Sequence, residues 1–421
     1  MKLFLFFLYI ISTNENELKL IKIPFILYFP EKITTNNIIE KLSDIRLITK
    51  IKIGSNNEEI PLILDLEKYP IYISGRNTST NQKFNENLSK DFKALDNKKE
   101  IITKDKDFIK GYIGTDNFSL NDYLTKIDFI FFLSTYNKYI KSGTLGLQFH
   151  YENNFNNDMK KTNFINQLKE KNLISNKCFF FRFDKNDKNK GELIIGLLPH
   201  EQNKNLDIKN YKTARVSNWQ VYHTWRISLS DVRINNNSIY DYECNDLISF
   251  NSNSLLIKAP MIFIKYIENN FFNQNGCEKL LLNDSRTYYF YCNDNVDIKK
   301  FPNLFFSYKL ENQINFTFTY KDLFFKINNK NFFLIISGLY DWEFGILFLQ
   351  KYETIFNQEI KTIGWYEIEK KNYFTSIILI IIIFILLFII FFLLIFIRKK
   401  FIRKIRKNEI NDNYEYIPEI F

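Results

Sequence analysis

Short apolar runs constrain the fold of this chain more than any other feature of its sequence. They are rich in Ile, Phe and Tyr, and Asn, Asp, Lys or Gly separates each run from the next. Typical examples are IKIGS, LILDL, IYIS, FIFFLS, CFFFRF, ELIIGLL and FTFTY. Short runs of β-branched and aromatic residues bounded by turn-forming residues are typical of strands. Since helical periodicity is scarce before the C-terminal region, the sequence predicts an all-β domain.

A long apolar segment near the C-terminus, Phe374–Ile397, consists almost wholly of Ile, Leu and Phe. No charged residue lies between Lys371 and Arg398. At about 1.5 Å per residue, these roughly 24 residues cover about 36 Å, enough to cross a hydrocarbon core of about 30 Å. A cluster of Lys and Arg follows at once, and such clusters favour the cytoplasmic side. The sequence therefore predicts a transmembrane helix over 374–397 and a basic cytoplasmic tail over 398–421.

The N-terminus, MKLFLFFLYIIST, has one Lys, then an apolar run, then small polar residues. The run from Leu3 to Ile11 is too short to span a bilayer, and the pattern predicts a signal peptide over residues 1–13. Together with the C-terminal helix, this predicts a single-pass type I membrane protein of the secretory pathway, in an endomembrane or the plasma membrane. Its large domain would be lumenal or extracellular.

The net charge of +10 on 421 residues is largely local, because seven Lys and Arg lie between Arg398 and Lys407. The remainder is nearly neutral and has no basic stripe interleaved with aromatic residues, so we expect no nucleic-acid partner. The three histidines, at positions 150, 200 and 223, are dispersed, and there is no CxxC pair. We therefore expect neither a metal site nor a cofactor.

The segment Ile51–Ser74 reads as three strands, and the second of them ends in Asp65. Gly54 closes the first strand, and Tyr72 lies in the third. This arrangement resembles the way in which pepsin-like aspartic proteases present their first catalytic Asp. Further segments resemble the same family in the same order: Lys141–Phe149, Asn163–Glu201, Val221–Ile239, Phe301–Tyr308 and Trp342–Ile368.

The resemblance implies a bilobal, all-β, pepsin-like fold, with an N-terminal lobe over 47–205 and a C-terminal lobe over 206–369. The preceding segment, 14–46, includes the string LKLIKIPF, which resembles a propeptide strand of the family. We expect a monomeric ectodomain whose cleft between the lobes accepts an extended peptide or a protein ligand.

Aspartic proteolysis requires two carboxylates that share a proton, one activating water while the other polarises the scissile carbonyl. In the family each Asp is followed by Thr-Gly, in which Thr locks the two loops together and Gly permits a tight turn. The first loop here reads Asp65-Leu66-Glu67. Asp65 is retained, but Leu66 has no hydroxyl and Glu67 adds a side chain and a charge.

The second loop lies within Asp246–Pro260 and contains no carboxylate after Leu247. One alignment puts Phe250 at the Asp position, and the other puts Asn251 there, with Ser252 and Asn253 in place of Thr-Gly. Asn251 is slightly preferred because Asn is isosteric with Asp and polar. Neither residue can supply the acid–base proton.

The flap of the family is altered as well. Counting back from Gly111-Tyr112 places Lys104 at the position of the flap tyrosine, in a highly charged segment. The second Asp, both Thr-Gly supports and the flap therefore all depart from the family pattern. Because a catalytic dyad acts as a unit, losing one Asp removes most of its catalytic power.

Four cysteines, at positions 178, 244, 277 and 292, suit an oxidising compartment. The resemblance implies a disulfide between Cys277 and Cys292, whereas Cys178 reads as a buried free thiol and the partner of Cys244 stays open. The candidate glycosylation sites are the sequons at Asn77, Asn87, Asn117, Asn236, Asn283 and Asn315.

Three functions remain open. The first is a pseudoprotease that binds an extended peptide or a protein partner without hydrolysis. The second is an active, membrane-anchored aspartic endopeptidase that uses Asp65 and an unrecognised second carboxylate. The third is a surface protein that has kept the fold alone.

Overall fold

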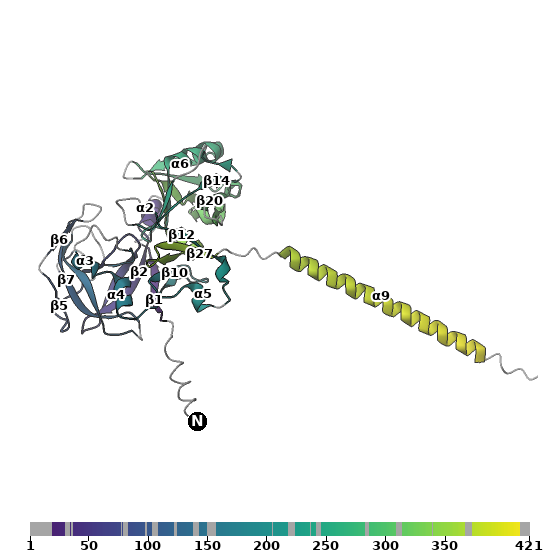
Figure 1. Cartoon of the computed structure of the whole chain (residues 1–421). Coiled ribbons are helices and arrows are strands. Elements are labelled where there is room, and N and C mark those ends of the chain that lie inside the picture. Colours follow the sequence, from purple (N-terminus) through teal and green to yellow (C-terminus); the bar gives the residue numbers. More distant parts are fainter. Residues whose placement is uncertain are drawn as a thin grey trace, which may run out of the picture. The chain divides into compact units, whose positions relative to one another are not determined.

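The structure, a computed structural model, is shown in Figure 1. It describes residues 19–29, 34, 37–76, 78, 83–96, 99–102, 108–121, 124–137, 143–149, 157–203, 205–217, 224–235, 237–240, 246–282, 286–308, 314–338, 340–366 and 373–412. The chain divides into two units, Met1–Glu367 and Ile368–Phe421. The first unit is built mostly of strands, with a few short helices, so the prediction of an all-β domain is confirmed.

A large sheet runs through the first unit and contains strands from both ends of it. Its strand order is β12-β27-β26-β10-β11-β1-β2-β3-β9-β4-β8-β7-β5, with β6 paired to β7. Eight of its strands are β5 (Lys93–Ala94), β6 (Lys99–Ile102), β7 (Phe108–Ser119), β10 (Cys178–Phe183), β11 (Lys190–Ile195), β12 (Tyr211–Arg215), β26 (Ile355–Asn357) and β27 (Thr362–Tyr366).

Strand β1 (Ile21–Tyr28) lies inside this sheet, between β11 and β2. Alternate residues are buried and exposed along its whole length, as expected of a strand with one face on the core. The Phe25 ring packs against Phe181 and Phe183, with centroids 5.8 and 5.2 Å away. The segment predicted to resemble a propeptide thus contributes a strand to the sheet, and α2 (Ile38–Ser43) follows it.

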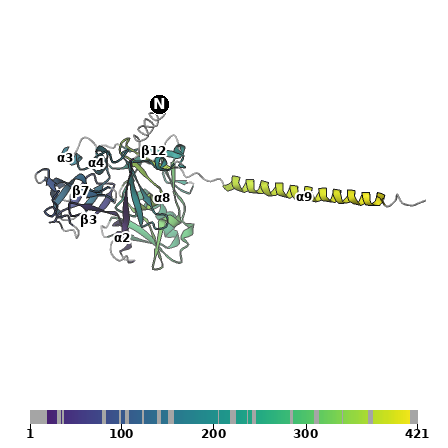
Figure 2. The same cartoon turned by 90° about the horizontal axis from the view of Figure 1, so that it is seen from below.

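Two sets of five strands repeat the same topology. The first set, in spatial order, is β2 (Arg46–Ile53), β3 (Glu58–Asp65), β9 (Gly143–Gly146), β4 (Ile71–Ser74) and β8 (Ile127–Asn137). The second is β13 (Arg226–Ser228), β16 (Leu247–Phe250), β25 (Trp342–Phe344), β17 (Ile257–Ala259) and β24 (Ile335–Ser337). The successive pairs are antiparallel, parallel, antiparallel and parallel in both sets. This repeat defines two lobes, which Figure 2 shows with β3, β7 and α4 in one and α8 in the other.

Two small sheets and several short helices complete the second lobe. The sheets are β15-β14-β20-β21 and β18-β19-β23-β22. Their strands are β14 (Asp231–Ile234), β15 (Asn237–Ser238), β18 (Glu278–Leu281), β19 (Tyr288–Asn293), β20 (Leu304–Tyr308), β21 (Ile314–Phe318), β22 (Phe324–Ile327) and β23 (Lys330–Phe333). The helices of the two lobes are α3 (Asn157–Lys160), α4 (Phe164–Glu170), α5 (Pro199–Gln202), α6 (Met261–Ile267), α7 (Tyr320–Leu323) and α8 (Ile346–Lys351).

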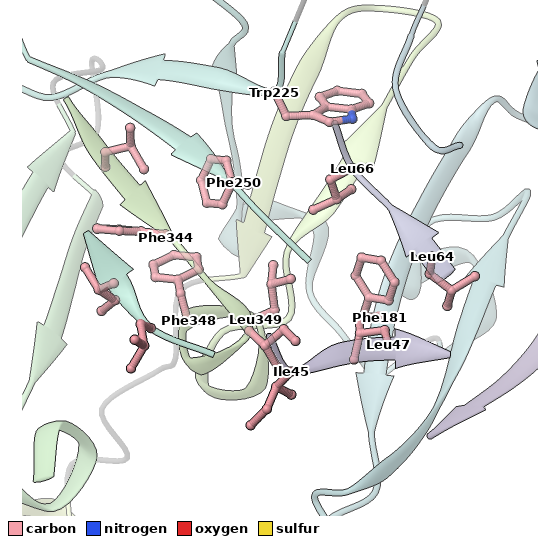
Figure 3. Packing of buried hydrophobic residues seen from close by; sticks show 14 of the residues in the cluster. Ile45, Leu47, Leu64, Leu66, Phe181, Trp225, Phe250, Phe344, Phe348 and Leu349 are labelled. Carbon is pink, nitrogen blue, oxygen red and sulfur yellow. The ribbon is translucent and has the colours of Figure 1, made fainter. Parts of the chain in front are cut away.

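An aromatic core joins the lobes. Trp225, at the start of the second lobe, is fully buried and lies edge-on to Phe149 and Phe356, with centroids 4.8 and 5.0 Å away. Figure 3 shows Leu64 and Leu66 of the first lobe in the same cluster as Trp225 and Phe250 of the second. Because these side chains flank the loops after β3 and β16, the core fixes both loops in place.

Helix α9 (Tyr373–Asp412) forms the second unit. Within its described part, Ile382–Arg403 is long and apolar enough to cross a membrane. At about 1.5 Å per residue these 22 residues span about 33 Å. The structure thus confirms the predicted apolar C-terminal helix and identifies it as the candidate membrane span among the described residues. The predicted signal peptide, 1–13, and the end of the predicted tail, 413–421, lie outside the described residues.

Candidate active site

Asp65 is the last residue of β3, and its side chain is buried. Its Oδ1 accepts hydrogen bonds from the backbone N–H groups of Glu67 at 2.8 Å and Lys68 at 3.1 Å. An Asp that bonds the backbone two residues on forms an Asx turn, which bends the chain as it leaves the strand. The carboxylate of Asp65 is therefore held in a fixed direction by its own loop.

Asn251 begins the corresponding loop of the second lobe and is also buried. Its Oδ1 accepts a hydrogen bond from the Asn253 N–H at 2.6 Å, the same two-residue turn as in the first loop. In the repeated topology, Leu64 pairs with Leu145 on β9, and Phe250 pairs with Phe344 on β25. The repeat thus relates Phe250 to Leu64, and Asn251 to Asp65.

Phe250 behaves as a core residue. It lies within β16, it is 1% exposed, and its ring packs against Phe348 and Phe356 with centroids 5.5 and 5.9 Å away. A side chain enclosed in this way has no access to the space between the loops, which leaves that position to Asn251.

Ser252 joins the two loops. Its Oγ donates a hydrogen bond to the Leu64 carbonyl at 2.7 Å and accepts one from the Leu66 N–H at 3.0 Å. Leu64 and Leu66 are the residues immediately before and after Asp65. The bridge therefore holds the loop that carries Asn251 against the loop that carries Asp65. The sequence predicts the loss of both Thr supports, but the Ser252 hydroxyl performs the locking contact from the second lobe. The one indication of this contact in the sequence was the hydroxyl group of Ser252, which Thr also carries.

Leu66 occupies the matching position in the first loop and is fully buried in the core cluster. Leu has no hydroxyl, so it cannot return the contact that Ser252 makes. The lock between the loops is therefore one-sided.

A glycine packs behind each loop. A Cβ on Gly146 would lie 2.7 Å from the Lys68 carbonyl oxygen, and one on Gly345 would lie 2.4 Å from the Ser254 carbonyl oxygen. Both distances are shorter than a carbon–oxygen contact permits, so each position accepts only glycine. The apolar-Gly segments that supported the family resemblance thus have the same function in both lobes.

Glu343, which sequence reasoning missed, contacts the second loop. Its Oε1 accepts a hydrogen bond from Asn251 Nδ2 at 2.9 Å and lies 2.9 Å from Lys258 Nζ. Glu343 lies on β25 and Lys258 on the adjacent strand β17. No local pattern reveals this contact, because Asn251 and Glu343 are 92 residues apart.

Lys104, Asn77, Asn236, Asn283 and Cys244 fall outside the described residues. The predicted disulfide between Cys277 and Cys292 is confirmed, and Cys178 is a buried free thiol.

Three sequons lie in the described part of the chain. Asn87 is exposed in a turn. Asn117 Nδ2 donates to Asp91 at 2.9 Å, and Asn315 Oδ1 accepts a hydrogen bond from Ser307 at 2.7 Å. Since N-glycosylation requires an accessible amide, Asn87 is the best placed of the three.

Chemically, the two loops present one carboxylate and one amide at related positions. An amide holds no titratable proton, so Asp65 and Asn251 cannot share a proton as a carboxylate dyad does. Both side chains can accept hydrogen bonds, but of the two only the Asp65 carboxylate can act as a base. The two loops therefore carry a carboxylate at one of the two related positions and an amide at the other.

The family model for eukaryotic aspartyl proteases matches residues 46–367. A search of curated proteins finds no match to the chain. The matched region contains both loops, the Ser252 bridge and all ten strands of the repeat. The chain therefore belongs to the eukaryotic aspartyl protease family, with a pepsin-like domain followed by a candidate membrane helix.

Proposed function

We propose that this protein is a membrane-anchored pseudoprotease, which binds an extended peptide or a protein partner between its lobes without hydrolysing it. The observation that supports this most is the amide of Asn251 at the position that the repeat relates to Asp65. Hydrolysis by this family needs one ionised and one protonated carboxyl group. The amide of Asn251 can serve as neither of these two carboxyl groups.

The intact framework around the two loops supports a binding function. The Ser252 bridge, the two glycines and the aromatic core keep the loops together although the dyad is incomplete. Extended peptides bind such folds through main-chain hydrogen bonds, as an added strand does, and this needs no catalytic carboxylate.

We propose that the protein is oriented as type I. The signal peptide over 1–13 would direct the aspartyl protease domain into the lumen or outside the cell, and the basic cluster after the span would keep the tail in the cytoplasm. The disulfide between Cys277 and Cys292 suits that oxidising side of the membrane.

The test is a hydrolysis assay on the full chain in detergent micelles, with a mixed peptide library from pH 3 to pH 7. We expect no cleavage above that of a chain carrying Asp65→Ala. Cleavage that Asp65→Ala abolishes would overturn the proposal. Retention of library peptides by the wild-type chain separates a binding protein from one that has kept the fold alone.

Glu343 makes an active endopeptidase the second candidate, because it is a carboxylate in direct contact with the second loop. It would have to serve as the second acid from β25. Its contacts oppose this role, since the same carboxylate oxygen already accepts from Asn251 and pairs with Lys258. If the wild type does cleave peptides, Glu343→Gln decides whether Glu343 is that acid.

A further inference from the structure

We propose that Glu343 is a positioning residue that fixes a neutral amide at position 251. A carboxyl group introduced there would share its proton with Glu343 inside the second lobe and would not form a dyad with Asp65 across the lobes. This inference rests on the proposed function, because it explains why Asn251→Asp alone would not rebuild the active site.

The hydrogen bonds of the Asn251 amide determine its orientation. Oδ1 accepts from the Asn253 N–H at 2.6 Å, and Nδ2 donates to Glu343 at 2.9 Å. Flipping the amide would place oxygen against the carboxylate and NH₂ against an N–H, so both hydrogen bonds would be lost. Glu343 therefore requires a donor at position 251, and an ionised carboxylate has none.

The first lobe shows that this requirement is not a general feature of the fold. Ile63 pairs with Thr144, and Ser249 pairs with Glu343, so the repeat relates Glu343 to Thr144. Tyr72 pairs with Thr144 in the first lobe, and Lys258 pairs with Glu343 in the second, so the repeat also relates Lys258 to Tyr72. A neutral Thr–Tyr pair thus occupies these strand positions in the first lobe, and a charged Glu–Lys pair occupies the related positions in the second. The acidic neighbour is specific to the second lobe.

The charges around position 251 come from both lobes. Glu343 and Lys258 lie on the second-lobe strands, Asp65 lies on the facing loop, and Glu67 and Lys68 follow Asp65 on that loop. Lys258 neutralises one carboxylate of the second lobe, so a second one at position 251 would be uncompensated at about 3 Å from Glu343. Like charges at that distance repel, which disfavours ionisation of a carboxyl introduced at position 251.

The test compares Asn251→Asp in four backgrounds of the full chain in detergent micelles: wild type, Glu343→Gln, Asp65→Asn, and both. Asn251→Asp with Glu343→Gln exchanges the amide and the carboxyl and leaves the net charge unchanged. Glu343→Gln and Asp65→Asn without Asn251→Asp are the controls. The measurement is Tm between pH 4 and pH 8.

A carboxyl whose pKa is higher in the folded chain than in the unfolded chain stabilises the fold below its unfolded pKa. This contribution is lost as the pH rises through the folded pKa. We expect the pKa of the new carboxyl to rise by about one unit or more, a tenfold change in its ionisation constant. As the pH rises from 4 to 7, the Tm of Asn251→Asp should therefore fall by about 2 °C or more relative to the Tm of the wild type.

In the Asn251→Asp chain, adding Glu343→Gln should remove this pH-dependent loss of Tm, whereas adding Asp65→Asn should leave the loss in place. The opposite result, removal by Asp65→Asn and persistence with Glu343→Gln, would overturn the inference, as would a Tm profile for Asn251→Asp that coincides with wild type. If Asn251→Asp prevents folding, Glu343→Gln must restore it, and failure to do so also overturns the inference. None of these outcomes depends on hydrolysis, so the proposed function is judged separately.

Discussion

Buried polar atoms, more than charged ones, hold the two loops together. The Oγ of Ser252 satisfies one backbone carbonyl and one backbone N–H of the opposite lobe. A buried backbone group without a partner costs far more than an average hydrogen bond gains. The bridge therefore contributes to stability mainly by preventing two such losses.

Replacing Ser252 by Ala should lower the free energy of unfolding by about 1–3 kcal/mol, because the Leu64 carbonyl and the Leu66 N–H would be left unsatisfied. Urea denaturation of the full chain in micelles measures this. Ser254→Ala is the matched control: Ser254 is equally buried on the same loop, but its Oγ accepts a hydrogen bond from Leu256 within that loop. Equal losses in the two variants would contradict a bridging role for Ser252.

Cys178 should be unreactive in the folded protein. It is fully buried in β10, and burial raises the pKa of its thiol from 9.0 to about 12. The thiolate fraction at neutral pH falls about a thousandfold for such a shift. Iodoacetamide labelling followed by peptide mass mapping should therefore find Cys178 modified in guanidinium and unmodified in the native chain. Rapid native labelling at Cys178 would show that the strand opens.

At the scale of elements, strands could be predicted where apolar residues alternate or cluster between turn residues. IKIPFILY forms strand β1, and the first three residues of IKIGS end strand β2. The alternation along β1 sets which of its faces is buried. Their partners could not be predicted in the same way. Strand β1 pairs with β2 nearby and with β11, well over a hundred residues further along the chain. Pairing across such separations depends on the register of the whole sheet, which no local pattern encodes.

Because β1 pairs with strands on both sides, we expect it to contribute to the stability of the domain. We expect Phe25→Ala to lower the free energy of unfolding by about 3–5 kcal/mol, since it removes a buried ring that fills the space over Gly191. Ile26→Ala is the control, because Ile26 is 47% exposed on the opposite face, and it should cost only about 0.5 kcal/mol. Chemical denaturation measures both. A small effect of Phe25→Ala would indicate that β1 can leave the sheet.

The whole molecule combines an aspartyl protease domain with a helix that is apolar on all sides. The described side chains of Ile382–Arg403 are almost all exposed, so the protein itself gives them no apolar surroundings. A helix of this kind is stable when lipid covers it.

A chain that ends at Tyr366 should be soluble, whereas the full chain should stay with membranes during alkaline carbonate extraction. The difference follows from removing the apolar helix while leaving the strand β27 complete. Fractionation of cells that express each form measures it. Carbonate release of the full chain would show that the helix does not span.

Orientation should depend on the basic cluster. Replacing the seven Lys and Arg between Arg398 and Lys407 by Gln should produce chains of mixed orientation, because the charge bias that retains the tail in the cytoplasm is lost. Protease protection of a C-terminal tag reports the orientation. A tag that stays fully accessible from the cytoplasm would show that the signal peptide alone sets the topology.

Sequence patterns predicted the all-β class, the family resemblance and the candidate membrane helix, and the resemblance implied the disulfide. These depend on local patterns, on the order of segments, or on uninterrupted apolar length. The tertiary structure supports the preference for Asn251 over Phe250 as the residue related to Asp65. It alone revealed the Ser252 bridge and the contact of Glu343 with the second loop. The reason is distance along the chain: Leu66 and Ser252 are 186 residues apart, and Asn251 and Glu343 are 92 apart. Such contacts exist only when two sheets with fixed registers bring the loops together.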